Sequence, residues 1–192
     1  MNPVTHFLVS WGVANLATLE RRDRAIVTLA GIAPDLDGLG AIPDLLTRNS
    51  AHALDWFGRY HHVLGHNVGF ALVVSGASLL FAMRRWKAAG LACATFHLHL
   101  LCDVLGARGP DGDQWPIPYL LPVSGAWQWT WSGQWALNGW QNFAITGGAL
   151  ALAFYLAWSR GFSPFEMVSA RADGAFVGAL RERFGAPRER SH

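Results

Sequence analysis

The sequence predicts an all-α fold: a multi-helix membrane bundle with a His/Asp metal site at one end and a C-terminal amphipathic helix. Hydrophobic residues make up 52% of the 192 residues and charged residues only 15%, whereas soluble domains average about 25% charged residues. The ten Trp residues point the same way, because indoles favour the membrane interface. Apolar stretches of helical length, separated by charged turns, are the third observation. We expect residues 1–162 to form the bundle and residues 163–192 a C-terminal unit.

Five apolar stretches make up the predicted bundle. The stretch from Val63 to Met83 would span about 31 Å and that from Gly139 to Trp158 about 30 Å, each enough to cross a bilayer core. The first two stretches along the chain are short for full spans. An irregular polar stretch is predicted up to Arg59, and a loop rich in Pro, Gly and Trp from Gly106 to Asn138. The predicted helices run from Val4 to Leu19, Ala25 to Ala33, Val63 to Met83, Ala88 to Leu105 and Gly139 to Trp158.

The C-terminal unit begins with Ser163-Pro164-Phe165-Glu166, which has the form of a capping box with Pro at the first helical position. Apolar residues then recur at helical spacing among several Arg residues. This pattern predicts a basic amphipathic helix lying on the membrane surface, and a helix docked on the protein's own core is the alternative. We expect a disordered tail from Gly185 to His192. The apolar positions are Phe165, Val168, Ala172, Phe176, Leu180 and Phe184.

The stretch from residue 96 to 103 places ionisable groups inside an apolar helical run. His99 and Asp103 are four residues apart, so on a helix they share one face. A buried carboxylate or imidazole without a partner is costly. A metal ion would satisfy both groups, and a plain hydrogen bond between them is the alternative. His97 lies about 200° around the helix from His99, so we expect it to make a structural hydrogen bond instead.

Helix lengths bring ligand-type side chains from four segments to a similar depth in the bundle. Counted from the first basic turn, His6 lies about 21 Å up the bundle and Asp35 about 16 Å. Counted from the second basic turn, His66 lies about 27 Å, His99 about 18 Å and Asp103 about 24 Å up. The sequence therefore predicts that these side chains form one cluster.

Two further groups of ligand-type residues lie near this depth. Asp35 and Asp37 follow a Pro in an expected extended segment, where residues two apart point to the same side. A solvated Asp-Gly turn is the alternative for this pair. His62 and His66 would share a helix face, but His61 would also reach inward if the helix starts after it. The choice between His61 and His62 stays open.

Charges separate between the two ends of the predicted bundle. Most Lys and Arg residues and all Glu residues lie at the basic turns or in the C-terminal unit. The positive-inside tendency then places this end in the cytoplasm and the His/Asp end on the outer side. No nucleic-acid partner is expected, because the His/Asp end is net negative and repels phosphate backbones unless metal ions reverse its charge. The Asp residues of that end are Asp35, Asp37, Asp44, Asp55, Asp103, Asp111 and Asp113.

The ligand types indicate the chemistry. Imidazole and carboxylate groups without a thiolate cluster suit zinc, with manganese or iron as alternatives, and more than four candidates suggest two or three ions. Such ions lower the pKa of bound water and clamp phosphoryl or carbonyl oxygens. No Gly-x-Ser-x-Gly elbow is present, so metal-activated water is the expected nucleophile. The alternative is a non-catalytic membrane protein that binds or transports metal ions, although a transporter needs ligands along a path rather than at one depth.

Four short motifs occur in an order that resembles a known family. Together they resemble the bacterial LexA-regulated, membrane-bound metal-dependent hydrolases, over residues 3–125. That family is distantly similar to zinc-dependent phospholipase C and P1-type nucleases. The resemblance implies a multi-pass hydrolase of the cytoplasmic (inner) membrane that cleaves a phosphoester of a small-molecule or lipid-like substrate. The motifs are Thr5-His6, Pro34-Asp35-Leu36-Asp37, the segment from His61 to His66, and His99-x-x-x-Asp103.

From the residues themselves, Asp37 and Asp103 are the candidate catalytic carboxylates, with Asp37 as general base. The resemblance adds a set of metal ligands. Many family members carry Arg directly after the first His of the His-x-x-x-x-His motif, where this chain has His62. This difference leaves the ligand identity and a phosphate-binding role there open. The implied metal ligands are His6, Asp35, Asp37, His61, His66, His99 and Asp103.

The loop after Asp103 supplies candidate substrate contacts. The segment from Arg108 to Pro118 matches the Pro-rich loop of one subgroup of the family. Arg108 is the candidate cation for substrate, with Arg59 as a second choice and a solvated loop charge as the alternative for either. Trp115 and its neighbouring Trp residues would form a wall for substrate or, alternatively, an interfacial aromatic belt.

Overall fold

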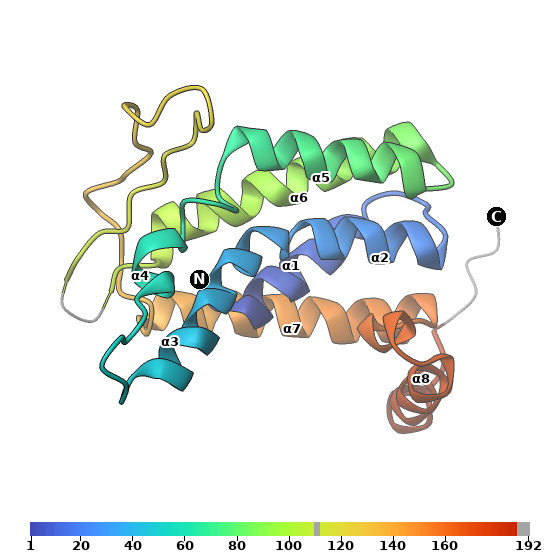
Figure 1. The fold of residues 1–192 in the computed structure, drawn as a ribbon. Helices are drawn as coiled ribbons and strands as arrows, with labels where there is room; N and C mark the ends of the chain where they lie inside the picture. The colour runs from blue at the N-terminus through green and yellow to red at the C-terminus, as the bar shows by residue number, and fades with distance from the viewer. Residues whose placement is uncertain (110–111, 188–192) are drawn as a thin grey trace.

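The computed structural model describes residues 1–109 and 112–187, and in this part the protein is all-helical, as predicted (Figure 1). Asp111 and the last residues of the predicted tail, 188–192, lie outside the described residues. Within the described ranges β-pairing is limited to two isolated bridges. The elements are α1 (Pro3–Ala14), α2 (Arg21–Ala30), η1 (Ala33–Gly40), α3 (Ala41–Thr47), α4 (Trp56–Tyr60), α5 (Val68–Phe81), α6 (Arg85–Gly106), α7 (Trp140–Arg160), η2 (Pro164–Met167) and α8 (Ala170–Phe184).

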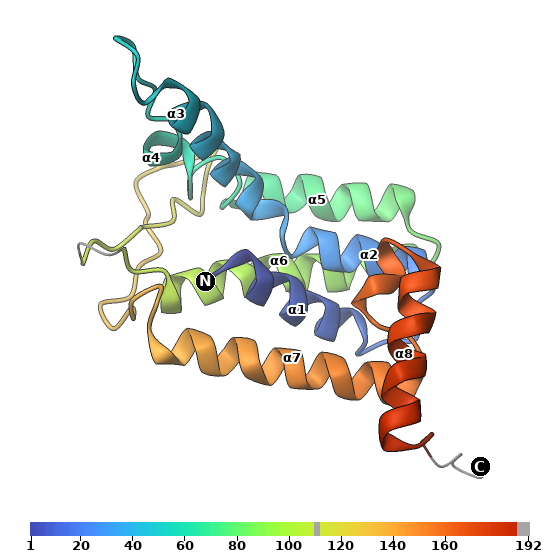
Figure 2. The same cartoon turned by 90° about the horizontal axis from the view of Figure 1, so that it is seen from below.

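The long helices run back and forth along one axis and form an up-and-down bundle (Figure 2). The α1–α2 turn, the α5–α6 turn and the end of α7 lie at one end, which we call the basic end. The N-terminus, α3, α4 and the loop of residues 107–139 lie at the opposite end, which we call the site end. The predicted separation of the basic turns from the His/Asp residues is therefore confirmed.

Among the described residues, two helices are long and apolar enough to cross a membrane. These are α6 and α7. The pair formed by α2 and the segment 33–47 passes the same test together, with a bend of 49° at its break, so it is a third candidate span. Helix α5 is apolar but has only 14 residues, about 21 Å, which is short for a bilayer core.

Helix α5 begins later than the sequence predicts. The predicted start at Val63 is wrong because Asn67 caps the helix: its side-chain oxygen accepts a hydrogen bond from the Phe70 N–H at 2.9 Å. Its side-chain amide donates to the carbonyls of Val63 and Leu64. An Asn that bonds its own backbone in this way competes with helix formation. Residues 61–67 therefore form a turn, and this turn carries three His side chains.

The segment with Asp35 and Asp37 is a 3₁₀ helix, η1, so the prediction of an extended segment is wrong. Pro34 lies in the first turn of this helix, directly after Ala33, where its fixed φ is suitable and its missing N–H is not needed. A 3₁₀ helix turns about 120° per residue, so residues two apart point in different directions. The polar stretch that follows was predicted to be irregular and contains the short helices α3 and α4.

The described part of the loop of residues 107–139 is irregular, as predicted, and it closes the site end. Ile117 is fully buried and packs in one cluster with Phe96 and Leu100 of α6. The amide of Asn142, at the start of α7, donates to the carbonyl of Gly106 at 2.8 Å and to that of Leu137 at 2.7 Å. These contacts hold the end of α6 and the start of α7 together beside the loop.

Two buried carboxylates hold the basic end together. Asp23 accepts hydrogen bonds from the backbone N–H groups of Met83 and Arg84, both at 2.8 Å, and so joins α2 to the α5–α6 turn. Glu166 accepts two hydrogen bonds from the Arg24 guanidinium, at 2.5 and 2.7 Å. The predicted capping-box role of Glu166 is wrong, because its carboxylate is used in this ion pair.

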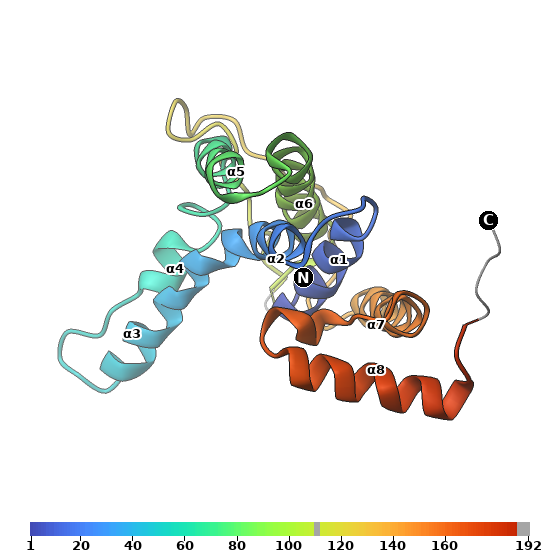
Figure 3. The same cartoon turned by 90° about the vertical axis from the view of Figure 1, so that its right-hand side faces the viewer.

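Helix α8 lies crosswise over the basic end instead of along the bundle (Figure 3). Val177 and Leu180 are buried against Ala157 of α7. Phe165 just before the helix and Phe184 at its end are exposed. A helix that crosses the candidate spanning helices in this way has the orientation expected of a helix on a membrane surface. One face of α8 is thus docked on the protein, as the alternative to a purely membrane-bound helix predicted. The exposed apolar side chains remain available for contact with a bilayer interface.

Candidate metal centre

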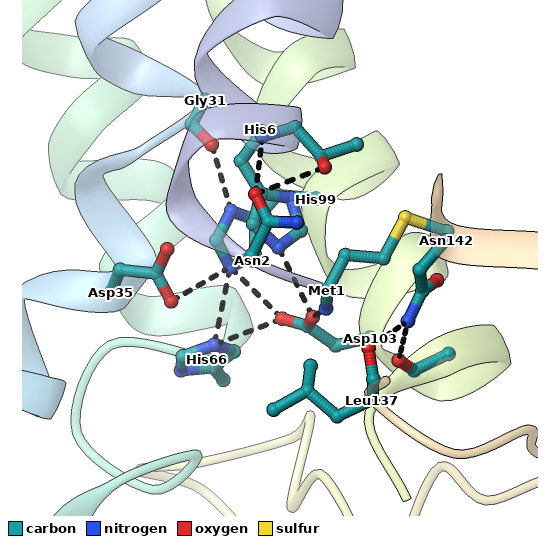
Figure 4. A network of polar contacts seen from close by, with 12 residues as sticks. Met1, Asn2, His6, Gly31, Asp35, His66, His99, Asp103, Leu137 and Asn142 are labelled. Carbon is teal, nitrogen blue, oxygen red and sulfur yellow. Dashed lines mark hydrogen bonds and ion pairs between the residues drawn. The ribbon is translucent and has the colours of Figure 1, made fainter. Parts of the chain in front are cut away.

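His99 and Asp103 lie at the middle of a buried cluster. Helix α6 presents both on one face, with Asp103 Oδ2 3.0 Å from His99 Nε2. His6 Nε2 of α1 lies 3.1 Å from Asp103 Oδ1, and His66 Nε2 lies 3.4 Å from Asp103 Oδ2. Asp35 Oδ1 of η1 is 3.6 Å from His99 Nε2. Figure 4 shows these side chains meeting from four segments, so the convergence predicted from helix lengths is confirmed.

The ligand atoms form two groups that share Asp103. Within each group, one ligand atom per residue lies within 4.8 Å of all the others. A carboxylate has two oxygens with several lone pairs, so Asp103 is able to contact two ions at once. The arrangement therefore fits a site for two metal ions. The first group is His6, Asp35, His99 and Asp103, and the second is His62, His66 and Asp103.

The two central imidazoles have their outer nitrogens already occupied. His99 Nδ1 donates to the carbonyl of Gly31 at 2.8 Å, since a carbonyl only accepts. His66 Nδ1 donates to the Asp37 carboxylate at 3.1 Å. Both Nε2 atoms therefore face inward, 3.3 Å from each other and beside Asp103 Oδ2. Three acceptors that meet at one point require a cation between them, either a proton or a metal ion.

Three atoms of the cluster are buried without a hydrogen-bond partner among the described residues. They are Asp35 Oδ2, His62 Nδ1 and Asp103 Oδ2. Leaving such an atom unpaired costs about 1–3 kcal/mol, and coordination to a metal ion would remove this cost. The amino group of Met1 also contacts Asp103 Oδ1 and brings positive charge to this carboxylate. The donor set of imidazoles and carboxylates fits zinc, manganese or iron.

Asp37 and His61, both predicted as metal ligands, lie beside the two groups and not within them. Asp37 Oδ1 accepts from His61 Nδ1 at 2.8 Å, and Asp37 Oδ2 accepts from the Gly65 N–H at 2.8 Å as well as from His66. A Cβ on Gly65 would lie 2.2 Å from the Pro34 carbonyl oxygen, so only Gly permits this close approach. Asp37 thus orients the ligand-type His66, in the manner of the carboxylates that support metal-bound histidines.

His62, the alternative to His61 in the sequence, belongs to the second group. Its backbone φ is 67°, a left-handed value that is uncommon for a residue other than Gly, costs about 1–3 kcal/mol and is typical of functional sites. This conformation buries the imidazole beside His66, with ring centroids 4.4 Å apart. Burial, together with the charge of His66, lowers the pKa of His62 to about 3. The ring is therefore neutral at pH 7 and its lone pair is available to a metal ion.

A pocket of about 280 Å³ opens beside the second group. Trp115 packs edge-on against His61 and His62, with ring centroids 5.2 and 5.1 Å apart, so this predicted substrate contact does lie at the pocket. Arg108, the other predicted contact, donates to the Ser132 carbonyl at 2.9 Å and is not part of the pocket wall. The walls are formed by Phe57, Gly58, His61, His62, Val63, Trp115 and Pro116.

His97 has the structural role that its position on the helix predicts. Its Nδ1 donates to the carbonyl of Cys93 at 2.8 Å, and its Nε2 accepts from the Tyr119 hydroxyl at 2.7 Å. Both nitrogens are used, so His97 joins the loop of residues 107–139 to α6. It supplies a control residue on the same helix as His99.

The fold and the cluster define a helical membrane protein with a buried His/Asp centre. A family model matches residues 1–171, and the chain belongs to the YdjM inner membrane protein family. The protein is therefore a bacterial inner-membrane protein, as predicted. No curated protein and no solved structure matches the chain. The match to the family supports the membrane part of the resemblance noted above, and hydrolysis stays a prediction.

Metal analysis of purified variants tests the centre. We expect the wild type to bind a divalent ion and His99→Ala and Asp103→Ala to lose most of it, because both remove atoms from the middle of the cluster. Asp37→Asn should retain metal with an affinity lowered about 10- to 100-fold. Elemental analysis and competition titration with a chelator measure these effects. His97→Ala is the matched control, and equal metal content in His99→Ala and the wild type would contradict the assignment.

Zinc affinity should increase with pH. Burial alone lowers the pKa of His66, but its contacts with the Asp103 and Asp37 carboxylates outweigh burial and raise the pKa to about 9. Below that pH the ring holds a proton that a metal ion must displace, so affinity should rise by about tenfold per pH unit up to about pH 9. Chelator-buffered titrations at pH 6, 7 and 8 measure this slope. A flat profile would show that His66 is not a ligand.

Proposed function

We propose that the protein is a membrane-embedded, metal-dependent hydrolase that cleaves a phosphoester. The observation that carries this proposal is the inward pair of Nε2 atoms of His66 and His99 against Asp103. Such a set of acceptors is suited to a divalent ion, and the shared carboxylate suits two. The adjacent pocket provides room for a substrate beside the second group.

The two groups would hold the ions separately. His6, Asp35 and His99 would supply one, His62 and His66 the other, and Asp103 would contact both. When bound, such ions lower the pKa of a water molecule and stabilise charge on phosphoryl oxygens. Zinc is the expected metal for these ligands, with manganese or iron as alternatives.

The remaining carboxylates have separate tasks. Both oxygens of Asp37 are engaged by His61, His66 and Gly65, so we assign Asp37 a positioning role, while its predicted role as general base stays untested. Asp35 has a partner-free Oδ2 and a side chain that is 20% exposed. Asp35 is thus the carboxylate of the cluster best placed to accept a proton from water.

Metal transport is the alternative function. A transporter requires ligands along a path through the bundle, whereas the ligand-type groups here gather at the site end. This arrangement favours hydrolysis. Metal binding by a wild-type protein that hydrolyses no phosphoester would instead favour the transport or storage of ions.

Hydrolysis of generic phosphoesters tests the activity. We expect the zinc-loaded wild type to release nitrophenol from p-nitrophenyl phosphate or bis(p-nitrophenyl) phosphate. Asp103→Asn should lower kcat/KM by about 100-fold or more, because the loss of a shared ligand removes several kcal/mol of transition-state stabilisation. Trp115→Ala should raise KM more than it lowers kcat. Activity of Asp103→Asn equal to that of His97→Ala, the matched control, would reject the proposal.

We further propose that the site end faces the outer side of the inner membrane, because the basic turns favour the cytoplasm. A Cys at Ala126, which is exposed in the loop of residues 107–139, should react with an impermeant thiol reagent in intact cells. A Cys at Met83, in the basic α5–α6 turn, should react only after lysis. The wild type is the background control, because Cys102 is buried and Cys93 lies within α6. The opposite labelling pattern would reverse the orientation.

A further inference from the structure

An apolar groove of about 450 Å³ runs between α2 and α5. Its walls come from α2, the start of η1 and one side of α5. No charged side chain lines it, and the hydroxyl of its polar residue, Ser78, donates to the Val74 carbonyl at 2.9 Å. The wall residues used below are Leu29, Leu36, Phe70, Val73, Ala77 and Phe81.

The groove faces the lipid and not the interior of the bundle. Val73 and Phe81 are 63% and 60% exposed, and Leu29 on the other wall is 51% exposed. Helix α5 packs along the spanning helix α6, so the groove lies at the depth of the hydrocarbon core. Water and polar groups are excluded there. The occupant is therefore an apolar chain.

One end of the groove is built by the segments that build the metal centre. Leu36 lies between Asp35 and Asp37 in η1, and Phe70 is in the first turn of α5, directly after the turn that carries His66. The groove wall and the ligand-type side chains thus come from the same short segments. The end of the groove nearest the site end therefore lies next to the segments that carry the ligand-type side chains.

The length of the groove matches one leaflet of a bilayer. From Phe70 to Phe81, α5 rises about 16 Å, close to half of the roughly 30 Å hydrocarbon core. Phe70 is at the start of α5, near the cluster, and Phe81 ends α5 beside the basic α5–α6 turn, so the groove extends from the side of the cluster to the basic end. A lipid acyl chain has this length and this chemistry.

We infer that the substrate is a membrane lipid, with one acyl chain in the groove and its phosphoester at the cluster. This inference rests on the proposed hydrolase function and names its substrate class. Lipid tails are as apolar as the groove, so the groove gains little from the hydrophobic effect. Its task is to orient the lipid, which brings the scissile bond to the cluster.

Filling the groove tests this inference. Ala77, part of the groove wall, is replaced by Phe, and Ala151→Phe on an exposed face of α7 is the matched control. Each zinc-loaded protein in lipid nanodiscs of phosphatidylethanolamine and phosphatidylglycerol is tested with bis(p-nitrophenyl) phosphate and for cleavage of the nanodisc lipids by mass spectrometry. We expect Ala77→Phe to lower lipid cleavage at least tenfold and to leave cleavage of the soluble ester unchanged. Ala151→Phe should change neither.

The remaining outcomes separate the two proposals. If the wild type cleaves neither ester, the proposed function fails and the lipid inference fails with it. If it cleaves the soluble ester but no lipid, or if Ala77→Phe cleaves both like the wild type, the function stands and the lipid inference is overturned. If Ala77→Phe loses both activities, the same two assays are repeated with Val73→Phe, which lies at the exposed rim of the groove. The outcomes given above then apply to that variant.

A phospholipid with a photoreactive group in its acyl chain gives a second readout that does not depend on turnover. We expect it to label peptides of α2 and α5 in the wild type and in Ala151→Phe, and at least tenfold less in Ala77→Phe. Equal labelling of all three proteins would overturn the inference. Crosslinking of α5 to a second copy of the chain in place of lipid would also overturn it, because the groove would then bind a helix.

Discussion

The charge of one buried carboxylate constrains the whole site end. Asp103 is 2% exposed, and an ionised carboxylate at that burial requires positive charge or hydrogen-bond donors from every direction. Three imidazoles from α1, α6 and the turn before α5 surround its side chain, and the Gln134 amide donates to its backbone carbonyl at 2.8 Å. Each of these segments must reach the same point. That requirement determines how the helices and the loop of residues 107–139 are arranged around α6.

The local conformation of the turn of residues 61–67 brings two of its histidines close to the Asp103 carboxylate. Asn67 ends the turn by capping α5, Gly65 permits contact with η1, and His62 adopts a left-handed backbone that directs its ring inward. An α-helix through these residues would spread their side chains around its circumference. The irregular turn instead brings His62 and His66 to one side, where the second ligand group forms. Local backbone strain and the loss of one helical turn accompany the assembly of the site.

The cluster lies between a pocket and an apolar groove. His61, His62 and Trp115 border a pocket at the loop end of the bundle, whereas Leu36 and Phe70 border the groove on the membrane face. The η1 helix separates the two, since Asp35 points to the cluster and Asp37 to the supporting histidines. This position suits chemistry at the boundary between a polar head group and an apolar tail. At the other end, the buried Arg24–Glu166 pair and the crosswise α8 hold the bundle at the basic surface.

The sequence by itself determined the all-α class, the separation of basic and acidic ends, and the meeting of His6, Asp35, His66, His99 and Asp103. Helical periodicity and rise depend only on local geometry, so counting residues is sufficient for these features. Only the tertiary structure decided that η1 is a 3₁₀ helix, that Asn67 starts α5, that Glu166 pairs with Arg24, and that His62 joins the ligand groups in place of His61. Three of these depend on a partner distant in sequence or on a backbone conformation that the surrounding packing selects, and neither leaves a periodic signal in the chain. The Asn67 cap is local, because its partners lie within four residues, and it is a helix-start signal that apolar periodicity alone does not contain.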